Sequence, residues 1–220
     1  MMKFPTCAHI KNGFCLIIMR RLFVTGIGTN VGKTVISAIL AEKLQADYWK
    51  PIQAGDLDNT DSMKVSQWLE NSTSVIHREV YRLTEPMSPH AAADRDGESI
   101  DLNNIITPET KSDLVIEGAG GLMVPLNKHD LVIDLISHLQ AEAVLVSQHY
   151  LGSINHTILS IEALRSRNIN IAGIIFNGVE NIDTESIIKS ICAVPILGRI
   201  PEISDINPSN IYNAKKYIKI

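Results

Sequence analysis

A glycine-rich segment near the N-terminus has the sequence TGIGTNVGKT, at residues 25–34. It follows a short apolar run, LFV at 22–24, and it opens a longer segment of helical periodicity. Glycines let the backbone approach an anion closely, and the N–H groups that begin a helix point toward that anion. Lys33 can then reach the β- and γ-phosphates of a nucleotide, and the Thr34 hydroxyl can hold Mg²⁺. The segment therefore predicts a phosphate-binding loop.

The spacing of this loop differs from the usual pattern G-x4-G-K-[ST]. That pattern requires a glycine where Ile27 stands, so the loop fits a version that is one residue longer and begins at Gly26. A glycine-rich turn that serves only helix packing is the weaker interpretation, because GKT lies between a predicted strand and a predicted helix.

Outward from the loop, short apolar segments alternate with longer segments of helical periodicity. Continuous apolar strands that alternate with helices indicate parallel strands covered on both faces. The sequence therefore predicts an α/β fold with a doubly wound, mostly parallel sheet and helices on both faces. In such sheets ligands bind at the carboxyl ends of the strands. The predicted strands are 22–25, 47–50, 113–117, 143–147, 171–177 and one that starts at 194–197, and the predicted helices are 33–45, 61–70, 131–139, 154–167 and 184–192.

The composition is that of a globular protein. The chain has 220 residues, of which 45% are apolar and 20% are charged, and its net charge is −4. This excludes a largely disordered chain, and the mild acidity argues against general nucleic-acid binding. No apolar run approaches the roughly 18 residues of a membrane-spanning helix. We therefore expect no nucleic-acid or membrane partner. Since no CxxC spacing joins Cys7, Cys15 and Cys192, we also expect a reducing compartment and a cytoplasmic location.

The first residues precede the first predicted strand. The apolar run at 14–19 is too short for a secretory segment, and no small-residue cleavage site follows it. Met19 would make a natural translation start. We expect residues 1–19 to be a dispensable N-terminal extension and residues 20–220 to form a single domain.

Two acidic residues and a second lysine are further candidates for the site. Glu117 ends a predicted buried strand before the small residues GAGG at 118–121, where a carboxylate can bind Mg²⁺ directly or through water. A strand-end capping glutamate is the weaker interpretation. Asp61, in NTDS at 59–62, is a second candidate ligand, although taken alone it favours a helix N-cap. Lys50 taken alone would be a solvated surface lysine, but at the carboxyl edge of the sheet it can balance charge on a transferring phosphoryl group.

The phosphate-binding loop is one of several recognisable motifs along the chain. They are TGIGTNVGKT (25–34), WKPIQAG (49–55), NTDS (59–62), PMSPHAAA (86–93), VIEGAGGLMVPL (115–126), LGSINHT (151–157), IIFN (174–177) and GRIP (198–201). Together, and in this order, they resemble the dethiobiotin synthetase family of the P-loop NTPase class. The resemblance spans nearly everything from residue 20 onward. EGAGG with a downstream LGxINH is specific, whereas GKT alone is not.

This resemblance implies an ATP- and Mg²⁺-dependent ring closure in biotin biosynthesis. In the family, 7,8-diaminopelargonate takes up CO2 as a carbamate on one amine, and ATP phosphorylates that carbamate. The second amine then attacks the mixed anhydride, which closes the ureido ring of dethiobiotin and releases ADP and phosphate. Such a reaction depends on positioning and on charge stabilisation.

The resemblance also implies roles for the residues that match the family's motifs. Lys50 would be the catalytic lysine and would act with Lys33 on the transferring group, and Thr34, Asp61 and Glu117 would surround Mg²⁺. The family implies a homodimer in which the loop at 151–155 of one chain holds the substrate carboxylate in the other chain's site. The nucleotide residues would be Asn30, Val31, Gly32, Lys33, Thr34, Val35, Asp61, Glu117, Gly118, Ala119, Gly120, Asn177, Gly178, Pro201, Glu202 and Ile203, and the substrate residues would be Thr29, Ala54, Gly120, Leu151, Gly152, Ser153, Ile154 and Asn155.

Several positions bear on the alternatives. Ala54 stands where the family commonly has a hydroxyl residue, and Asn30 occupies a position that is often acidic. Gly28 stands where partition and septum-positioning ATPases carry an extra lysine, which weakens the alternative that the chain is such a switch. An amidating synthetase, the other alternative, would normally bring a glutaminase domain, for which this length leaves no room. His149 and His156 are not expected to bind zinc, because no cysteine or carboxylate stands at ligand spacing.

Overall fold

The computed structural model describes residues 19–220 of the chain. This part contains nine strands and seven α-helices. The strands are β1 (Arg21–Gly26), β2 (Asp47–Trp49), β3 (Ile52–Ala54), β4 (Ile76–His77), β5 (Tyr81–Leu83), β6 (Leu114–Gly121), β7 (Glu142–Gln148), β8 (Ile171–Asn177) and β9 (Ile196–Ile200). The helices are α1 (Lys33–Leu44), α2 (Asp61–Trp68), α3 (Pro89–Asp96), α4 (Val132–His138), α5 (Ser153–Ser166), α6 (Ile182–Cys192) and α7 (Pro208–Ala214), with short 3₁₀ turns at Leu102–Asn104 and Lys215–Tyr217.

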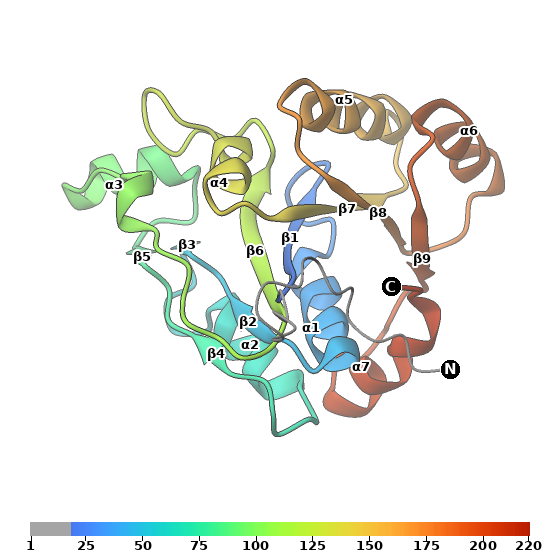
Figure 1. The fold of residues 1–220 in the computed structure, drawn as a ribbon, viewed down its shortest axis with the longest axis horizontal. Helices are drawn as coiled ribbons and strands as arrows, with labels where there is room; N and C mark the ends of the chain where they lie inside the picture. The colour runs from blue at the N-terminus through green and yellow to red at the C-terminus, as the bar shows by residue number, and fades with distance from the viewer. Residues whose placement is uncertain (1–18) are drawn as a thin grey trace, which may run out of the picture.

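Seven of these strands form one sheet in the order β4-β2-β6-β1-β7-β8-β9, with every neighbouring pair parallel (Figure 1). β3 and β5 form a separate parallel pair. The chain passes from β1 to β2 on one side of the sheet, and after β6 it crosses to β7 on the other side of β1. The direction of winding therefore reverses around β1, which is where open parallel sheets bind ligands. The predicted α/β fold is confirmed.

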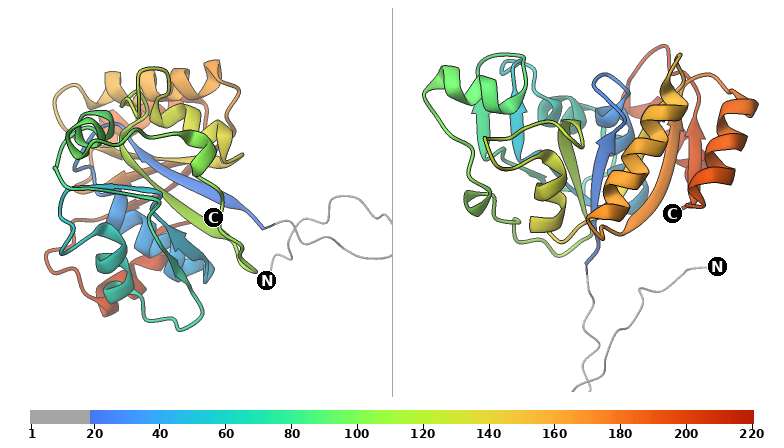
Figure 2. Two further views of the ribbon diagram at one scale, coloured as in Figure 1. Left: turned by 90° about the vertical axis from the view of Figure 1, so that its left-hand side faces the viewer. Right: turned by 90° about the horizontal axis from the view of Figure 1, so that it is seen from above.

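Helices cover both faces of the sheet (Figure 2). One face packs against α1, α2 and α7, and the other packs against α4, α5 and α6. In β1, Leu22 and Val24 belong to the first core layer, whereas Phe23 belongs to the second. This division follows from strand geometry, because successive side chains point to opposite faces. Within residues 19–220, no helix has the length and apolarity needed to cross a bilayer.

The long periodic elements lie close to where the sequence predicts them, and several of the short ones were missed. The strand at Ile171–Asn177 has the predicted bounds. β6 continues through Gly121, so Glu117 lies within the strand and the small residues after it are also strand. The sequence analysis did not predict β3, β4, β5, α3 or α7, none of which exceeds eight residues. Segments this short contain too few residues for a clear period.

Candidate active site

A crevice of about 890 Å³ opens at the carboxyl ends of β1, β2 and β6. The phosphate loop forms one wall of this crevice, and β3 and the segment that leads into α3 contribute to the opposite wall. Of the residues predicted in the phosphate loop and the GAGG segment, Val31 and Gly118 do not line it. The predicted residues that line it are Thr29, Asn30, Gly32, Lys33, Thr34, Val35, Lys50, Ala54, Asp61, Glu117, Ala119 and Gly120.

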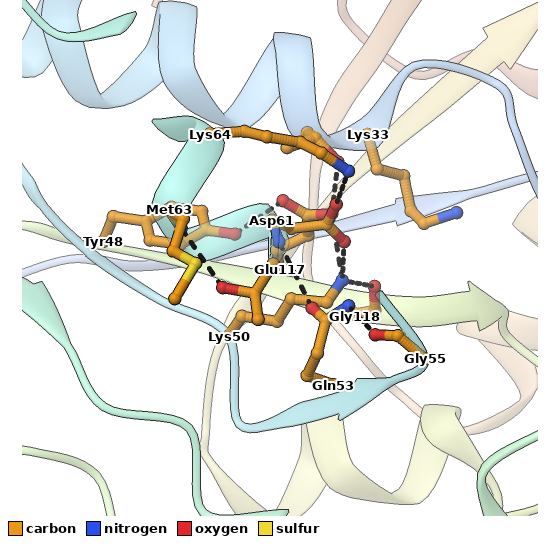
Figure 3. Close-up of polar contacts among 12 residues, drawn as sticks. Lys33, Tyr48, Lys50, Gln53, Gly55, Asp61, Met63, Lys64, Glu117 and Gly118 are labelled. Atoms are coloured by element: carbon orange, nitrogen blue, oxygen red, sulfur yellow. Dashed lines mark hydrogen bonds and ion pairs between the residues drawn. The ribbon is translucent and has the colours of Figure 1, made fainter. Parts of the chain in front are cut away.

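Glu117 lies at the floor of the crevice with its side chain 1% exposed. Both of its carboxylate oxygens accept hydrogen bonds (Figure 3). The Thr34 hydroxyl donates to Oε1 at 2.9 Å, and the Tyr48 hydroxyl donates to Oε2 at 2.8 Å. Burial and the charge of Glu117 raise the pKa of Tyr48 well above its ordinary value, so the phenol remains a hydrogen-bond donor. The carboxylate is thus held by groups from α1 and β2.

Lys50 places a buried ammonium between two carboxylates (Figure 3). Its Nζ lies 2.7 Å from Asp61 Oδ2 and 3.1 Å from Glu117 Oε1, and its side chain is 5% exposed. Burial alone would lower the pKa of Lys50, but the charges of Glu117 and Asp61 outweigh burial and raise that pKa above its ordinary value. The ammonium therefore stays charged at neutral pH. Its position in the crevice agrees with the predicted role and not with a solvated surface lysine.

Lys33 is the second buried cation of the site. Its Nζ donates to the carbonyl of Gly28 within the phosphate loop at 3.1 Å. Burial lowers the pKa of Lys33 to about 8; the Glu117 carboxylate raises this pKa, and the Lys50 ammonium lowers it further. A phosphate group is the kind of partner that would offset this loss of solvation. Lys33 is therefore more easily neutralised than Lys50.

Asp61 begins α2 and does not cap it. The N-cap is Thr60, whose hydroxyl accepts from the backbone N–H of Met63 at 3.2 Å, so the structure contradicts the alternative interpretation of Asp61 as an N-cap. Because Thr60 satisfies the helix end, the Asp61 carboxylate is free to face the crevice, where it pairs with Lys50 and with Lys64 at 3.5 Å. Burial favours the neutral form of Asp61, but Lys50 outweighs burial and lowers the pKa of that carboxyl.

Three residues that contact Glu117 or Asp61 were not predicted from the sequence. Tyr48 contacts Glu117, and Lys64 contacts Asp61. Gln53 donates to the Gly55 carbonyl at 2.9 Å and accepts from the Asp61 N–H at 3.3 Å, which ties the end of β3 to the start of α2. Strand alternation gave a usable signal for Tyr48, since it stands two residues before Lys50 in the predicted strand 47–50. No comparable local pattern points to Gln53 or Lys64.

A second cavity of about 310 Å³ adjoins the loop on the side of β7 and β8. Of the predicted nucleotide residues, Asn177, Gly178, Glu202 and Ile203 line this cavity, and Pro201 does not. Asn177 Nδ2 donates to the carbonyl of Val31 at 3.0 Å, which fixes the amide against the phosphate loop. Gly32 has a φ of +92°, and a Cβ on it would lie 2.1 Å from Asn177 Nδ2. Glycine is therefore required at this point of contact.

The remaining predicted substrate residues begin α5 and do not line the crevice of their own chain. Gly152 caps this helix in the left-handed region, and the side chain of Leu151 is fully exposed. Nearby, His156 Nδ1 lies 2.8 Å from the Tyr150 hydroxyl, and His149 Nε2 lies 3.1 Å from Glu185. Within residues 19–220, no three His, Cys, Asp or Glu side chains form a cluster that could hold a metal ion by themselves.

Comparison with known proteins identifies the family. A family model described as an AAA domain matches residues 20–210. An ATP-dependent dethiobiotin synthetase of Christiangramia forsetii is 60% identical over 82% of this chain and 86% of the relative. The chain belongs to the dethiobiotin synthetase family. Enzymes with the same description from Cytophaga hutchinsonii and Chlamydia pneumoniae are 53% and 46% identical, over 77% and 88% of this chain and 82% and 86% of theirs.

Two solved structures with a similar fold agree with the architecture. The MinC:MinD cell division complex of Aquifex aeolicus aligns with a TM-score of 0.53 at 13% identity, over 89% of this chain and 86% of that chain. A ParA family ATPase of Chlorobium tepidum aligns with a TM-score of 0.53 at 14% identity, over 90% and 98%. At these identities the likeness shows the fold alone. The relatives with high identity decide between the synthetase and the partition-type ATPase, and they favour the synthetase.

Proposed function

We propose that this chain closes the ureido ring of dethiobiotin from 7,8-diaminopelargonate, CO2 and ATP with the help of Mg²⁺. The observation that carries the proposal is the ammonium of Lys50, which is buried beside the phosphate loop and held between Asp61 and Glu117. A fixed cation in a crevice with a phosphate-binding loop suits the transfer of a phosphoryl group to a bound acceptor.

The reaction consists of two nucleophilic attacks separated by a phosphoryl transfer. One amine of the substrate attacks CO2 and loses a proton, which yields a carbamate. A carbamate oxygen takes the γ-phosphoryl group of ATP, and ADP leaves. The second amine attacks the carbonyl carbon of this mixed anhydride, phosphate leaves, and the ring closes as that amine loses its proton. The protein contributes position and charge in each of these steps.

The loop and the two lysines supply that charge. Backbone N–H groups at the start of α1 would hold the phosphates, with Lys33 reaching the β- and γ-phosphates. Lys50 would stabilise the negative charge that develops on the transferring group, because it stays charged and lies buried in the crevice beside the phosphate loop. Its pairing with Glu117 and Asp61 limits the motion of the ammonium before ATP binds.

The residues present fit a magnesium ion. The Thr34 hydroxyl donates a hydrogen bond to Glu117, so the lone pairs on the Thr34 oxygen stay available for a metal. With the carboxylates of Asp61 and Glu117, it offers the hard oxygen donors that Mg²⁺ prefers, in the small number that suits a site completed by phosphate oxygens and water. We assign Thr34, Asp61 and Glu117 to this site. When bound there, Mg²⁺ would neutralise negative charge on the β- and γ-phosphates.

The diamine would lie along the part of the crevice lined by Thr29, Ala54 and Gly120. The side chain of Ala54 has no hydroxyl and therefore makes no hydrogen bond to the substrate. The adenine would occupy the cavity beside Asn177. We further propose a homodimer, in which the exposed loop Leu151 to Asn155 holds the substrate carboxylate in the partner's site through the N–H groups that begin α5.

The location and the domain boundary are part of the same proposal. We propose a cytoplasmic enzyme, because the cysteine spacing suits a reducing compartment. We also propose that residues 20–220 form a single catalytic domain and that residues 1–19 are dispensable.

A direct assay tests the proposed function. The protein is incubated with ATP, Mg²⁺, bicarbonate and 7,8-diaminopelargonate, while phosphate release and dethiobiotin formation are followed together. We expect one phosphate for each dethiobiotin. A matched analogue that lacks one of the two amines can form a carbamate but cannot close the ring, so it should yield no cyclic product. Phosphate release that is indifferent to the diamine would show that the proposal is wrong.

A further inference from the structure

The two oxygens of Glu117 are held by different kinds of group. Oε1 accepts from Thr34 at 2.9 Å and from Lys50 at 3.1 Å, so it faces the crevice. Oε2 faces the interior, and within residues 19–220 the hydrogen bond it accepts is that of the Tyr48 hydroxyl at 2.8 Å. Tyr48 is fully buried, does not line the crevice and contacts the site through this carboxylate.

We infer that Tyr48 is a positioning residue for the magnesium site, because its hydroxyl fixes the rotation of the Glu117 carboxylate and keeps Oε1 turned toward Thr34. This inference rests on the proposed Mg²⁺ site. Tyr48 acts through Glu117 and is not a ligand itself. The aromatic ring is held in the core layer beneath α1, which gives the hydroxyl a fixed position.

The Tyr48 hydroxyl differs from the two other groups that hold the Glu117 carboxylate. Thr34 and Lys50 hold Oε1 from the crevice side, and both would change partners when Mg²⁺ and phosphates bind, because Thr34 would turn to the metal and Lys50 to the transferring group. Tyr48 has no such second task. It is therefore the contact that remains to hold the carboxylate in the loaded site.

The nature of the metal makes this orientation measurable. Mg²⁺ demands near-ideal octahedral geometry at short distances, whereas Ca²⁺ accepts irregular geometry and a variable number of oxygens. A Glu117 side chain that is free to rotate should therefore bind Mg²⁺ less well while its binding of Ca²⁺ changes little. Loss of a group that orients a metal ligand typically lowers metal affinity by about 10- to 100-fold.

The test uses Tyr48→Phe, which removes the hydroxyl and keeps the ring. Binding of a non-hydrolysable ATP analogue to the full chain is titrated with Mg²⁺ and, separately, with Ca²⁺, and the thermal midpoint is recorded. Tyr81→Phe is a matched control, since Tyr81 is also buried and its hydroxyl accepts from the Asp101 N–H at 3.0 Å outside the crevice. We expect Tyr48→Phe to raise the Mg²⁺ concentration needed for half-maximal binding about tenfold. The corresponding Ca²⁺ concentration and the metal-free binding of the nucleotide should be nearly unchanged.

Each other outcome has a defined meaning. An unchanged Mg²⁺ midpoint, or equal losses for Mg²⁺ and Ca²⁺ that follow the loss of thermal stability, would overturn the role of Tyr48. A Tyr48→Phe chain that does not fold would also overturn it, because the hydroxyl would then serve stability. In a Glu117→Gln background, Tyr48→Phe should cause no further loss of Mg²⁺ affinity, and a further loss would contradict an action through Glu117. If the wild-type chain itself shows no Mg²⁺-dependent binding, the proposed metal site fails instead.

Discussion

Replacing Lys50 with methionine separates the charge of this side chain from its packing. Lys50→Met keeps a stem of similar length and removes the ammonium that lies 2.7 Å from Asp61 and 3.1 Å from Glu117. Two carboxylates then face each other without the cation between them. We expect both stability and turnover to fall, for reasons that can be measured apart.

The size of the stability loss follows from what the two carboxylates retain. Removing one partner of a buried ion pair costs about 3–5 kcal/mol. Glu117 keeps its hydrogen bonds from Thr34 and Tyr48, and Asp61 is 21% exposed and keeps Lys64 at 3.5 Å. The loss should therefore lie at the lower end, about 3 kcal/mol, which a protein stable by about 5–15 kcal/mol can survive. Loss of a fixed charge that stabilises the transferring group should lower kcat by roughly 100- to 1,000-fold.

The assay combines urea unfolding, steady-state kinetics and nucleotide binding on the same preparation. Lys215→Met is a matched control, because Lys215 also pairs with a buried carboxylate, that of Glu42 at 3.5 Å. Neither residue lines the crevice. That pair is partly exposed, so the control should lose less than about 1 kcal/mol and keep its kcat. Mg²⁺ should stabilise Lys50→Met more than it stabilises the wild-type chain, since two carboxylates without their cation attract a divalent ion more strongly.

The pH dependence provides an independent check. The pKa of Asp61 is lowered in the folded wild-type chain, so its contribution to stability is present above the ordinary carboxyl pKa and disappears as the pH falls through the folded value. The difference between wild type and Lys50→Met should therefore shrink under acid conditions. The reasoning is refuted if Lys50→Met retains near-normal turnover, or if its unfolding free energy falls by less than about 1 kcal/mol at neutral pH.

Three further predictions follow from Lys33, Gly32 and the N-terminus. In the presence of a metal chelator, the Kd of ATP should rise above pH 8, by at most about tenfold per pH unit, because burial lowers the pKa of Lys33 to about 8 and only the ammonium attracts phosphate; calorimetric titration across this range checks it, and a flat profile would contradict it. Gly32→Ala should weaken nucleotide binding by at least about 2 kcal/mol, because its φ is +92° and its Cβ would strike Asn177. Gly97→Ala has a φ of +71° with no neighbour within 4 Å and thus measures the strain alone. Deleting residues 1–18 should leave kcat/KM intact, and a large loss would show that the extension contributes to the fold.

Local patterns accounted for the fold class and for the lysines, threonine and carboxylates of the crevice, and the family resemblance implied the other predicted residues. The helix after the loop and the strand at Ile171–Asn177 are long enough for their periods to be read, and their bounds were predicted closely. The strands β3 and β5 were not, since each is three residues long and exists because it pairs with the other. Short strands derive their stability from tertiary partners, which no local pattern records.

The assignment of Asp61 shows a different limit. Its position before a helical segment favours an N-cap, and only the structure shows that Thr60 takes that role. The choice between neighbouring polar residues depends on backbone angles at the helix end, and both residue types cap well. Once Thr60 satisfies the helix, the carboxylate of Asp61 becomes available to Lys50.

The sequence by itself determined the class of chemistry, because the phosphate loop is continuous along the chain and its glycines, lysine and threonine act from fixed spacings. Only the tertiary structure decided how the other groups meet. Lys50 and Glu117 are separated by 67 positions yet lie in contact, because the parallel pairing of β2 with β6 brings their carboxyl ends to one edge. The hydroxyl of Tyr48 reaches Oε2 of the same carboxylate for a related reason, since register and strand alternation set the direction of each side chain. The orientation of Glu117 is thus a property of the packed sheet, and no single segment of the sequence contains it.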